Sequence, residues 1–424
     1  MAQIKTFSAR ALHKRCGPVW AVVFAIAALA TSLNAADTAQ HQLLQPQGTV
    51  EVMRKGTQNW ALATTNIALF PGDAVRTGKD SRAAVRLVNE SVIRLNELTI
   101  MRFPEPASAR KRFLIHLLKG AAYFFHRERP VQTDFETPLV SGAIRGTEFN
   151  LEVADNGRTV LTLLDGAVEL ANAQGQLALQ TGEQAVVEPA AAPKKTAVLQ
   201  STNVNAIQWC LYYPAIIDLA ELGLSPAEEQ ALIDSLKAYR EGDLPRAAAA
   251  YPTARAGTSS AEKIYAAQLK LAVGQVAEAE TLLNGIGAAE GAYLASALRT
   301  LIAAVQFRDA PAIPESTSGS VLLAKSYYAQ SRFHLAQALE FAREASQRQP
   351  KFGFAWGRLA ELQFGFGNRK AAEESLGRAM KLSPVHAQAM STWGFVLAAK
   401  GDFSGAQATF NRAITLDSAL GNAW

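Results

Sequence analysis

The chain contains one short glycine motif with the spacing of a phosphate-binding loop. Gly142 and Gly146 stand four residues apart, with Arg145 between them and Thr147 directly after. A loop that binds phosphate also needs a lysine followed by serine or threonine, and a helix whose N-terminus faces the anion. Here the alternating stretch 149–153 follows instead, which is typical of a strand. We therefore expect a structural role, in which the two glycines form tight corners that a Cβ atom would obstruct.

Other residues that could carry acid–base or metal chemistry are scattered along the chain. The acidic pairs Glu228-Glu229 and Glu373-Glu374 fall in helical stretches and are expected on solvated faces. No nucleophile elbow occurs, and no cysteine–histidine pair has a credible spacing. The histidines show no close ligand pairing; they are His13, His41, His116, His126, His334 and His386. The sequence therefore predicts no catalytic residue, no metal ligand and no cofactor, and hence a protein that is not an enzyme.

Residues 1–35 have the three-part composition of a secretory signal peptide. Four basic residues and no acidic one precede or enter an apolar run from Val19 to Leu33, and a cleavage site follows at Leu33-Asn34-Ala35. This segment holds four of the five net positive charges, so the pI of about 9.1 does not indicate a nucleic-acid partner. The run is shorter than the roughly 20 residues that span a bilayer. We expect export to the periplasm; the alternative is a retained inner-membrane anchor, the one membrane contact predicted.

Residues 48–188 alternate apolar and polar side chains with a period of two, which predicts short strands. Turn residues separate them at regular spacing, as at Asn89-Glu90-Ser91, and Asp165-Gly166 gives the strongest hairpin signal. The stretch 110–120 is the one place where either a helix or a strand fits. This half is therefore expected to be all β, as a sandwich, a barrel or a β-solenoid. Residues 189–204 read as a linker rich in alanine and proline.

Residues 205–424 change to the period of a helix, with short turns between alanine-rich amphipathic segments. Small residues recur every 34 positions, at Ala338, Ala372 and Ala406, and Pro350 and Pro384 keep the same step. This resembles the tetratricopeptide repeat, most clearly over 319–420, and predicts an α-solenoid of four to six units. Trp424 falls where another repeat would open, so we expect the natural chain to continue beyond it.

The β half resembles the FecR domain of bacterial envelope proteins. The shared pieces occur in order over roughly 70–187. They are Gly72-Asp73, Val75-Arg76-Thr77-Gly78, Ser81-Arg82-Ala83, Ile93-Arg94-Leu95, Gly120, Thr137-Pro138, Arg145-Gly146-Thr147-Glu148-Phe149, Gly166 and Gly182-Glu183. The family usually has Asp-Gly-Ser where this chain has Asn89-Glu90-Ser91, which changes the turn because glycine tolerates positive φ and glutamate does not.

The resemblance implies a compact β domain that acts by contact and has no catalytic centre. In the namesake architecture a cytoplasmic segment binds a sigma factor, whereas fewer than twenty residues precede the apolar run here. The motif residues Gly72, Asp73, Thr77 and Gly78, and those of the stretch from Arg145 through Gly146 and Thr147 to Glu148, are expected to be structural or contact residues. Arg76 and Arg145 are the candidates for partner recognition, because arginine is enriched at interfaces. Glu148 is an expected ion-pair partner of Arg145.

The solenoid register places equivalent inward positions of successive units in two rows. One row contains Tyr327, Glu361 and Phe395, and the second contains Gln330 and Phe364. Such a concave surface can bind a peptide or a helix. The alternative is that Phe364 and Phe395 only pack between neighbouring helices.

Together these features predict an exported interaction or scaffold protein of a bacterial envelope, which brings protein partners together through its two halves. One alternative is a FecR-type transmembrane signalling regulator of substrate or iron uptake. A second is a cell-wall or carbohydrate-binding module of a larger envelope protein. The continuation of the chain beyond Trp424 and the mature N-terminus would discriminate between them.

Overall fold

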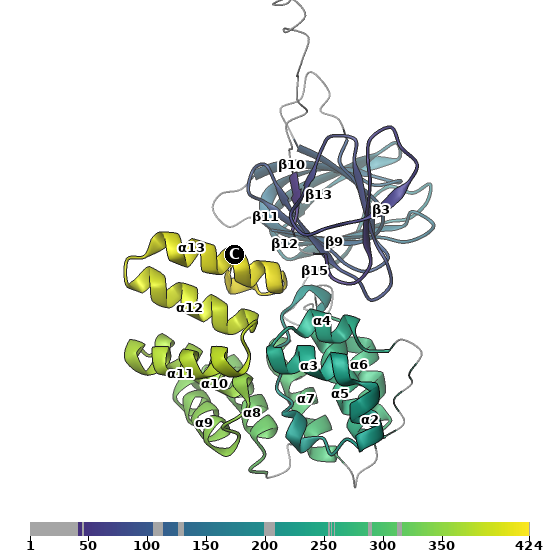
Figure 1. Ribbon diagram of the computed structural model, residues 1–424. Helices are drawn as coiled ribbons and strands as arrows, with labels where there is room; N and C mark the ends of the chain where they lie inside the picture. The colour runs from purple at the N-terminus through teal and green to yellow at the C-terminus, as the bar shows by residue number, and fades with distance from the viewer. Residues whose placement is uncertain are drawn as a thin grey trace, which may run out of the picture. The chain divides into compact units, whose positions relative to one another are not determined.

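The computed structural model describes residues 41–44, 46–104, 113–125, 131–198, 208–252, 255, 257, 259–286, 291–311 and 316–423. The predicted signal peptide, most of the second half of the predicted linker and Trp424 lie outside these ranges. Residues 41–198 form strands, and the described residues from 208 onward form helices and turns (Figure 1). The predicted fold class, an all-β half followed by an all-α half, is confirmed.

The strands of the first half join in one hydrogen-bonded sheet. All pairs are antiparallel except β9 with β10, and antiparallel pairing is typical of a sandwich or a barrel. The strands are β1 His41–Leu43, β2 Val50–Met53, β3 Trp60–Leu62, β4 Ile67–Leu69, β5 Ala74–Thr77, β6 Ala83–Leu87, β7 Val92–Leu95, β8 Ile100–Arg102, β9 Phe113–Phe125, β10 Val131–Glu136, β11 Ser141–Val153, β12 Thr159–Asn172, β13 Gly175–Gln180, β14 Glu183–Val187 and β15 Lys194–Val198.

The sheet curves around one apolar core. Phe124 and Phe149 stack at its centre with their ring centroids 4.9 Å apart, and Phe135 lies 6.1 Å from Phe149. Leu87, Ile93 and other buried side chains from both ends of the domain complete the cluster. The alternating pattern of the sequence is thus explained for strands such as β2 and β14, because alternate side chains of a strand point to opposite faces and one face lies on this interior.

Two long strands bend together at glycines that the sequence placed at corners. Gly146 of β11 lies opposite Gly166 of β12, and the register of the pair shifts immediately afterwards. The first part of β12 pairs with β14 and the second part with β13. Gly166 has a φ of 116°, which only glycine adopts without strain. The predicted hairpin at Asp165-Gly166 is therefore wrong: this pair marks a bulge at which both strands change direction.

The structure settles one choice that the sequence left open and moves two predicted boundaries. The stretch 110–120, which fitted either state, contributes to strand β9 from Phe113 on. The sheet begins at β1, before residue 48. Strand β15 occupies 194–198 inside the predicted linker, where it pairs with β14 and Lys195 forms a 2.7 Å ion pair with Glu183. A short, lysine-bearing strand is typical of a sheet edge, so its composition resembled a linker. Gly142 lies within β11 and not at a corner; a Cβ there would lie 2.1 Å from the Phe135 ring.

The helical half is built from pairs of helices joined by short turns. The helices are α2 Pro226–Ala231, α3 Ile233–Glu241, α4 Leu244–Ala249, α5 Ser260–Ala272, α6 Val276–Asn284, α7 Ala292–Val305, α8 Gly319–Ser331, α9 Leu335–Arg348, α10 Gly353–Gly365, α11 Arg369–Leu382, α12 Ala387–Ala399 and α13 Phe403–Leu416. Short 3₁₀ turns lie at Gln208–Cys210, Leu219–Glu221 and Gly421–Ala423. None of the helices in the described ranges combines the length and apolarity needed to cross a bilayer.

The last three pairs reproduce the 34-residue period of the sequence. Helices α8, α10 and α12 begin 34 residues apart, and so do α9, α11 and α13. The repeated alanines Ala338, Ala372 and Ala406 are buried, as small residues must be where two helices approach closely. Gly394 belongs to a second series with the same step, with Ser326 and Ala360, and a Cβ there would lie 2.6 Å from the Phe410 ring. These contacts explain why the repeat is visible in the sequence.

A buried arginine joins the two halves. Arg82, which directly precedes β6, is 5% exposed, and its three nitrogens donate to Gln47 Oε1 (3.2 Å), Trp209 O (2.9 Å) and Ala272 O (2.7 Å). The last acceptor is at the C-terminus of α5, where the helix dipole favours a cation. Gly274, with a φ of 79°, lets the chain pass this point, because a Cβ would lie 2.0 Å from Trp209 O. Asp80 adds a 3.0 Å contact to Lys270.

We expect Arg82→Met to destabilise the protein by about 3–5 kcal/mol, because it leaves buried carbonyl groups without donors and removes the more effective of the two arginines, Arg82 and Arg94, that offset the charge of the buried Asp417. Urea unfolding measures the change. Arg86→Met, four residues further along in β6, is the matched control, since Arg86 is half-buried and its loss should cost less than about 1 kcal/mol. Equal losses in the two variants would contradict a special role for Arg82.

The turn between β6 and β7 contains a strained glutamate. Glu90 has a φ of 62°, the conformation for which the related domains have glycine. We expect Glu90→Gly to stabilise the protein by about 0.5–1 kcal/mol, because relief of a left-handed residue outweighs the added freedom of the unfolded chain. Glu90→Ala should give no such gain, since it removes the charge but keeps the Cβ. Thermal unfolding compares them, and a gain in the alanine variant would point to charge as the cause.

Candidate functional site

A cleft of about 620 Å³ opens among the repeated helices of the second half. Successive first helices of the repeat, α8, α10 and α12, contribute Tyr327, Glu361 and Gln388 to one wall. Tyr327 and Glu361 are 34 residues apart, so the repeat itself brings equivalent positions side by side. Three of the five predicted groove residues, Tyr327, Gln330 and Glu361, thus line this cleft, and their role in partner binding stays a prediction.

The polar wall is a continuous chain of hydrogen bonds across three helices. Arg358 Nη1 lies 2.9 Å from Glu361 Oε2, and the same oxygen accepts from Gln388 Nε2 at 2.6 Å. Tyr327 donates its hydroxyl to Gln388 Oε1 at 3.0 Å. Side chains of α8 and α10 thus both hydrogen-bond to Gln388 of α12, so the polar wall is preorganised for binding.

Arg358 anchors this wall although it is only 1% exposed. Its Nε donates to Ser326 Oγ at 3.0 Å, its Nη2 donates to Ser326 O at 3.2 Å, and its guanidinium lies 4.0 Å from the centre of the Tyr327 ring. Burial raises the pKa of Tyr327, so its hydroxyl stays neutral and available as a donor. Because Glu361 compensates the charge of Arg358, the wall presents hydrogen-bonding groups without a strong net charge.

The opposite rim of the cleft is apolar. Phe307, Phe333 and Leu335 line it, and all three are among the exposed large apolar side chains of the described chain. Gln330 also lines the cleft, and its side-chain oxygen has no hydrogen-bond partner among the described residues. A surface with fixed polar groups on one side and exposed aromatic rings on the other is suited to binding, because the rings supply area and the polar groups orient the ligand.

The protein's own chain already occupies the neighbouring part of the helical half. Residues 212–217 run there without helix or strand, and Gln268 brackets them, accepting from Ile216 N (3.0 Å) and donating to Pro214 O (3.3 Å). Tyr239 donates to Ile217 O at 2.7 Å. Pro214 and its neighbour Tyr212 also line the cleft, so the cleft directly continues a surface that holds a non-helical segment by its backbone.

The predicted groove residues divide into two groups. Tyr327, Gln330 and Glu361 line the cleft, whereas Phe364 and Phe395 do not. Phe364 lies 6.3 Å from Phe395 between ring centroids, and a further contact of 4.8 Å joins Phe395 to Phe410. The two rings contact each other across neighbouring repeats, as the alternative interpretation held, although Phe395 remains 38% exposed.

Sequence reasoning missed several residues of the site. Arg358 could have been found, because it precedes Glu361 by three residues and so shares its helix face. Gln388 belongs to α12 but falls outside both predicted rows. Phe307 and Phe333 lie in turns, where the helical period gives no signal.

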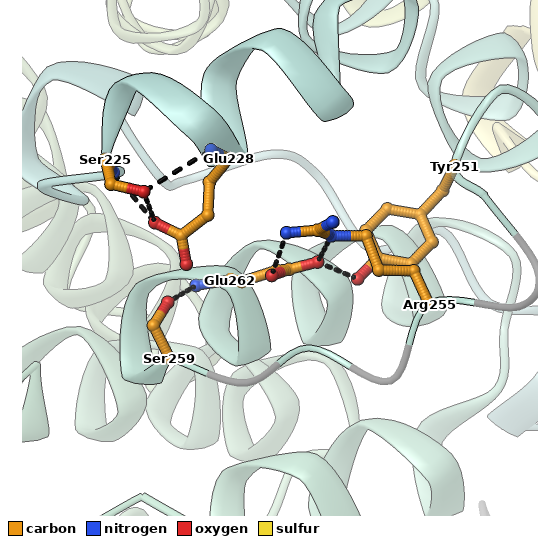
Figure 2. Close-up of polar contacts among 6 residues, drawn as sticks. All are labelled: Ser225, Glu228, Tyr251, Arg255, Ser259 and Glu262. Carbon is orange, nitrogen blue, oxygen red and sulfur yellow. Dashed lines mark hydrogen bonds and ion pairs between the residues drawn. The ribbon is translucent and has the colours of Figure 1, made fainter.

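A second polar cluster surrounds the starts of α2 and α5, and it has a different role. Figure 2 shows Ser225 and Glu228 bonded to each other as a capping box, with Oγ of Ser225 2.7 Å from Oε2 of Glu228. Figure 2 also shows the buried Glu262 bound by Arg255 and by the Tyr251 hydroxyl, the latter at 3.0 Å. The carboxylates are thus committed to caps and ion pairs, so we assign the cluster to the stability of the fold.

This cluster corrects the expectation for the first acidic pair. Glu228 is buried and Glu229 is exposed, so only one of the two lies on a solvated face. The sequence signal was present, because serine followed three positions later by glutamate is the signature of a capping box. In Glu373-Glu374 the second residue is exposed and the first forms a 2.7 Å ion pair with Lys400. Among the described residues no three histidine, cysteine, aspartate or glutamate side chains gather as a metal site would require.

In the β half, the glycine–aspartate motif organises a turn. Asp73 is buried and accepts from Arg54 Nη1 (2.6 Å), Lys55 N (3.0 Å) and Phe70 N (3.0 Å). Gly72 has a φ of 93° and donates to Phe103 O at 2.6 Å.

Residues 73–169 match the family model described as FecR protein. The chain carries a FecR domain. The match spans less than half of the chain.

Solved structures resemble each half at low identity. A candidate anti-sigma factor from Parabacteroides distasonis is 19% identical with a TM-score of 0.28, and the match covers 32% of this chain and 64% of that one. A tetratricopeptide repeat protein from Parabacteroides merdae is 16% identical with a TM-score of 0.30, covering 47% and 85%. YrrB, described as a TPR protein with an unusual peptide-binding site, is 14% identical with a TM-score of 0.23, covering 49% and 97%. No curated protein sequence matches the chain.

The remaining motif residues of the FecR domain hold its strands together. Thr77 accepts from Thr99 N at 2.9 Å, and Gly78 donates to Thr49 O at 2.8 Å. Arg76 lies between Glu51, at 2.6 Å, and the Trp60 ring, at 4.5 Å from its centre, and remains partly exposed. These contacts give Arg76 a fixed position at the surface.

The second half of the motif lies at the bulge of β11. Arg145 is exposed and lines a shallow depression of about 370 Å³ together with Asp134 and Glu169. The expected ion pair between Arg145 and Glu148 is not present among the described residues; Glu148 instead accepts the Tyr123 hydroxyl. The reason is the register shift after Gly146, which separates the two side chains. Gly146 and Thr147 contribute the bulge backbone itself.

The position of α12, and with it Gln388, depends on a buried histidine. His386 precedes α12, and its ring lies 4.4 Å from that of Phe354 of α10 and against Gly357. Both ring nitrogens are buried without a hydrogen-bond partner among the described residues. Burial lowers the pKa of His386 from 6.5 to about 3. Folding therefore requires the neutral ring.

This gives a prediction for pH. The unfolded chain binds a proton at His386 below pH 6.5 while the folded chain does not until about pH 3, so stability is complete above pH 6.5 and is lost as the pH falls through that range. The loss is at most about 1.4 kcal/mol for each pH unit. Urea unfolding at pH 7.5 and 5.0 should show a smaller difference for His386→Gln than for the wild type. His334→Gln, at an exposed site, should behave as the wild type; equal pH dependence in all three would contradict the assignment.

Proposed function

We propose that this chain is an exported, non-enzymatic interaction protein of a bacterial envelope, in which the helical half binds a segment of one protein partner and the FecR domain contacts another. The observation that carries the proposal is the cleft with its prearranged wall of Tyr327, Glu361 and Gln388. The similarity to FecR and tetratricopeptide proteins suggests a signalling or protein-interaction role. Export rests on the composition of residues 1–35.

The scaffold role follows from the joint between the two halves. Arg82 donates to backbone carbonyls of the helical half, so a partner on either half is held at a fixed distance from the other. On the FecR domain, Arg76 and Arg145 are the exposed arginines of the motif and are proposed as contact residues. The motif supports no catalytic role, since its other described residues are engaged in turns and strand contacts.

A second candidate is a signalling regulator that keeps its N-terminal segment in the inner membrane, and the match to the FecR family favours it. N-terminal sequencing of the mature protein separates the two functions. A start near Ala36 supports the exported scaffold. An intact leader in the membrane fraction supports the regulator.

Site-specific photocrosslinking tests the cleft. With a photoreactive phenylalanine analogue at Gln330, we expect a discrete adduct in cells, because this side chain faces the cleft. The matched control places the analogue at Gln347, an exposed position on α9 that does not line the cleft. The yield at Gln330 should exceed that at Gln347 at least tenfold. Equal adducts at both positions, or none at either, would remove the cleft as the binding site.

A further inference from the structure

The turns after the first helices of the repeat share an unusual backbone position. After α5, α10 and α12 the residue that follows the helix cap has a positive φ, and it is glycine: Gly274, Gly367 and Gly401. The same position is a phenylalanine after α7 and after α8: Phe307 has a φ of 55° and Phe333 a φ of 62°. Phe333 stands exactly one period of 34 before Gly367. A left-handed residue other than glycine costs about 1–2 kcal/mol.

These two phenylalanines carry a second cost. Phe307 is 64% exposed and Phe333 is 84% exposed, so neither ring returns stability through burial. Both rings line the same cleft, beside Leu335. Glycine would relieve both costs at both positions, as it does elsewhere in the repeat. Leu98 and Ala190 also have a positive φ, but Phe307 and Phe333 combine it with an exposed ring in one cleft, and such strain tends to cluster at functional sites.

We propose that Phe307 and Phe333 are the specificity-determining residues of the cleft, and that they select a non-helical protein segment with bulky apolar side chains. This inference rests on the proposed function and adds the chemistry of the partner. The rings would pack on the partner's apolar side chains, while Gln330, whose side-chain oxygen has no hydrogen-bond partner among the described residues, orients its backbone. The argument for a polypeptide is continuity, because residues 212–217 of the chain already lie beside the cleft and are held there through their backbone.

The charges in the cleft support an apolar and uncharged segment. Arg358 and Glu361 compensate each other at 2.9 Å, and Gln388 occupies the same carboxylate oxygen. An acidic segment would therefore find no available cation on this wall, and a basic segment would compete with Arg358. The lining that remains for a partner includes the aromatic rings of Phe307 and Phe333 and the side-chain amide of Gln330.

The test uses a labelled twelve-residue peptide in which leucine and phenylalanine alternate with serine and threonine, and a copy in which serine replaces the apolar residues. Fluorescence anisotropy should show binding of the first peptide to the wild-type protein at least tenfold tighter than of the second. Phe333→Gly and Phe307→Gly should each weaken this binding at least tenfold and also raise the thermal unfolding temperature. A ring with only a structural role would lower the unfolding temperature when it is removed. A higher unfolding temperature together with weaker peptide binding therefore indicates a role in binding.

Phe366→Ala is the matched control, since Phe366 is exposed in the equivalent turn of the next repeat, has a φ of −84° and does not line the cleft. It should leave binding unchanged. If the glycine variants bind the peptide as well as the wild type, while the Gln330 crosslink persists, this inference fails and the proposed function stands. If both fail, the proposed function fails as well.

Two other occupants give distinct results, and either would overturn the inference. A concentration-dependent dimer in sedimentation velocity that Phe333→Gly dissociates would show that a second copy covers the cleft. Co-sedimentation with phosphatidylglycerol vesicles that Phe333→Gly abolishes would show that the two rings insert into a lipid surface.

Discussion

A buried guanidinium is the constraint on which the arrangement of this protein depends. Arg82 has its three nitrogens committed to acceptors, and two of the acceptors are backbone carbonyls of the helical half. A cation removed from water must keep all its partners, so neither half can move away without leaving a charge unsatisfied. The same residue belongs to the Ser81-Arg82-Ala83 piece by which the FecR domain was recognised. A motif residue of the β domain thus serves as the joint to the solenoid.

The sequence predicted the helical half well because its packing repeats. Two helices that approach closely need small residues at fixed intervals, and the buried alanines Ala338, Ala372 and Ala406 meet this requirement. For the β half, the sequence predicted the all-β class but not how the strands connect and pair. Asp165-Gly166 has the composition of a hairpin turn, yet the choice between turn and bulge depends on Gly146 of a distant strand, which no local pattern reveals. Likewise β15 is a strand only because β14 offers it an unpaired edge.

The site shows the same division between periodic and non-periodic signals. Tyr327 and Glu361 were predicted because the repeat places equivalent positions on one surface. Phe364 and Phe395 obey the same period, but they lie outside the cleft, where their rings contact each other and Phe395 stays partly exposed. Phe307 and Phe333 belong to turns, and their significance appears only when backbone φ and exposure are read together.

The glycines of the repeat turns explain why those phenylalanines matter. In a solenoid each unit contributes its own stability and its contacts with neighbours, so a costly turn in one unit is tolerated when adjacent units are sound. The units that follow α8–α9 have Gly367 and Gly401 in these turns and buried alanines between their helices. They can support a strained unit beside the cleft without unfolding. In a repeat architecture, some units can stabilise the array while others present aromatic rings to a partner. The cleft lies at the units that carry such rings, Phe307 and Phe333.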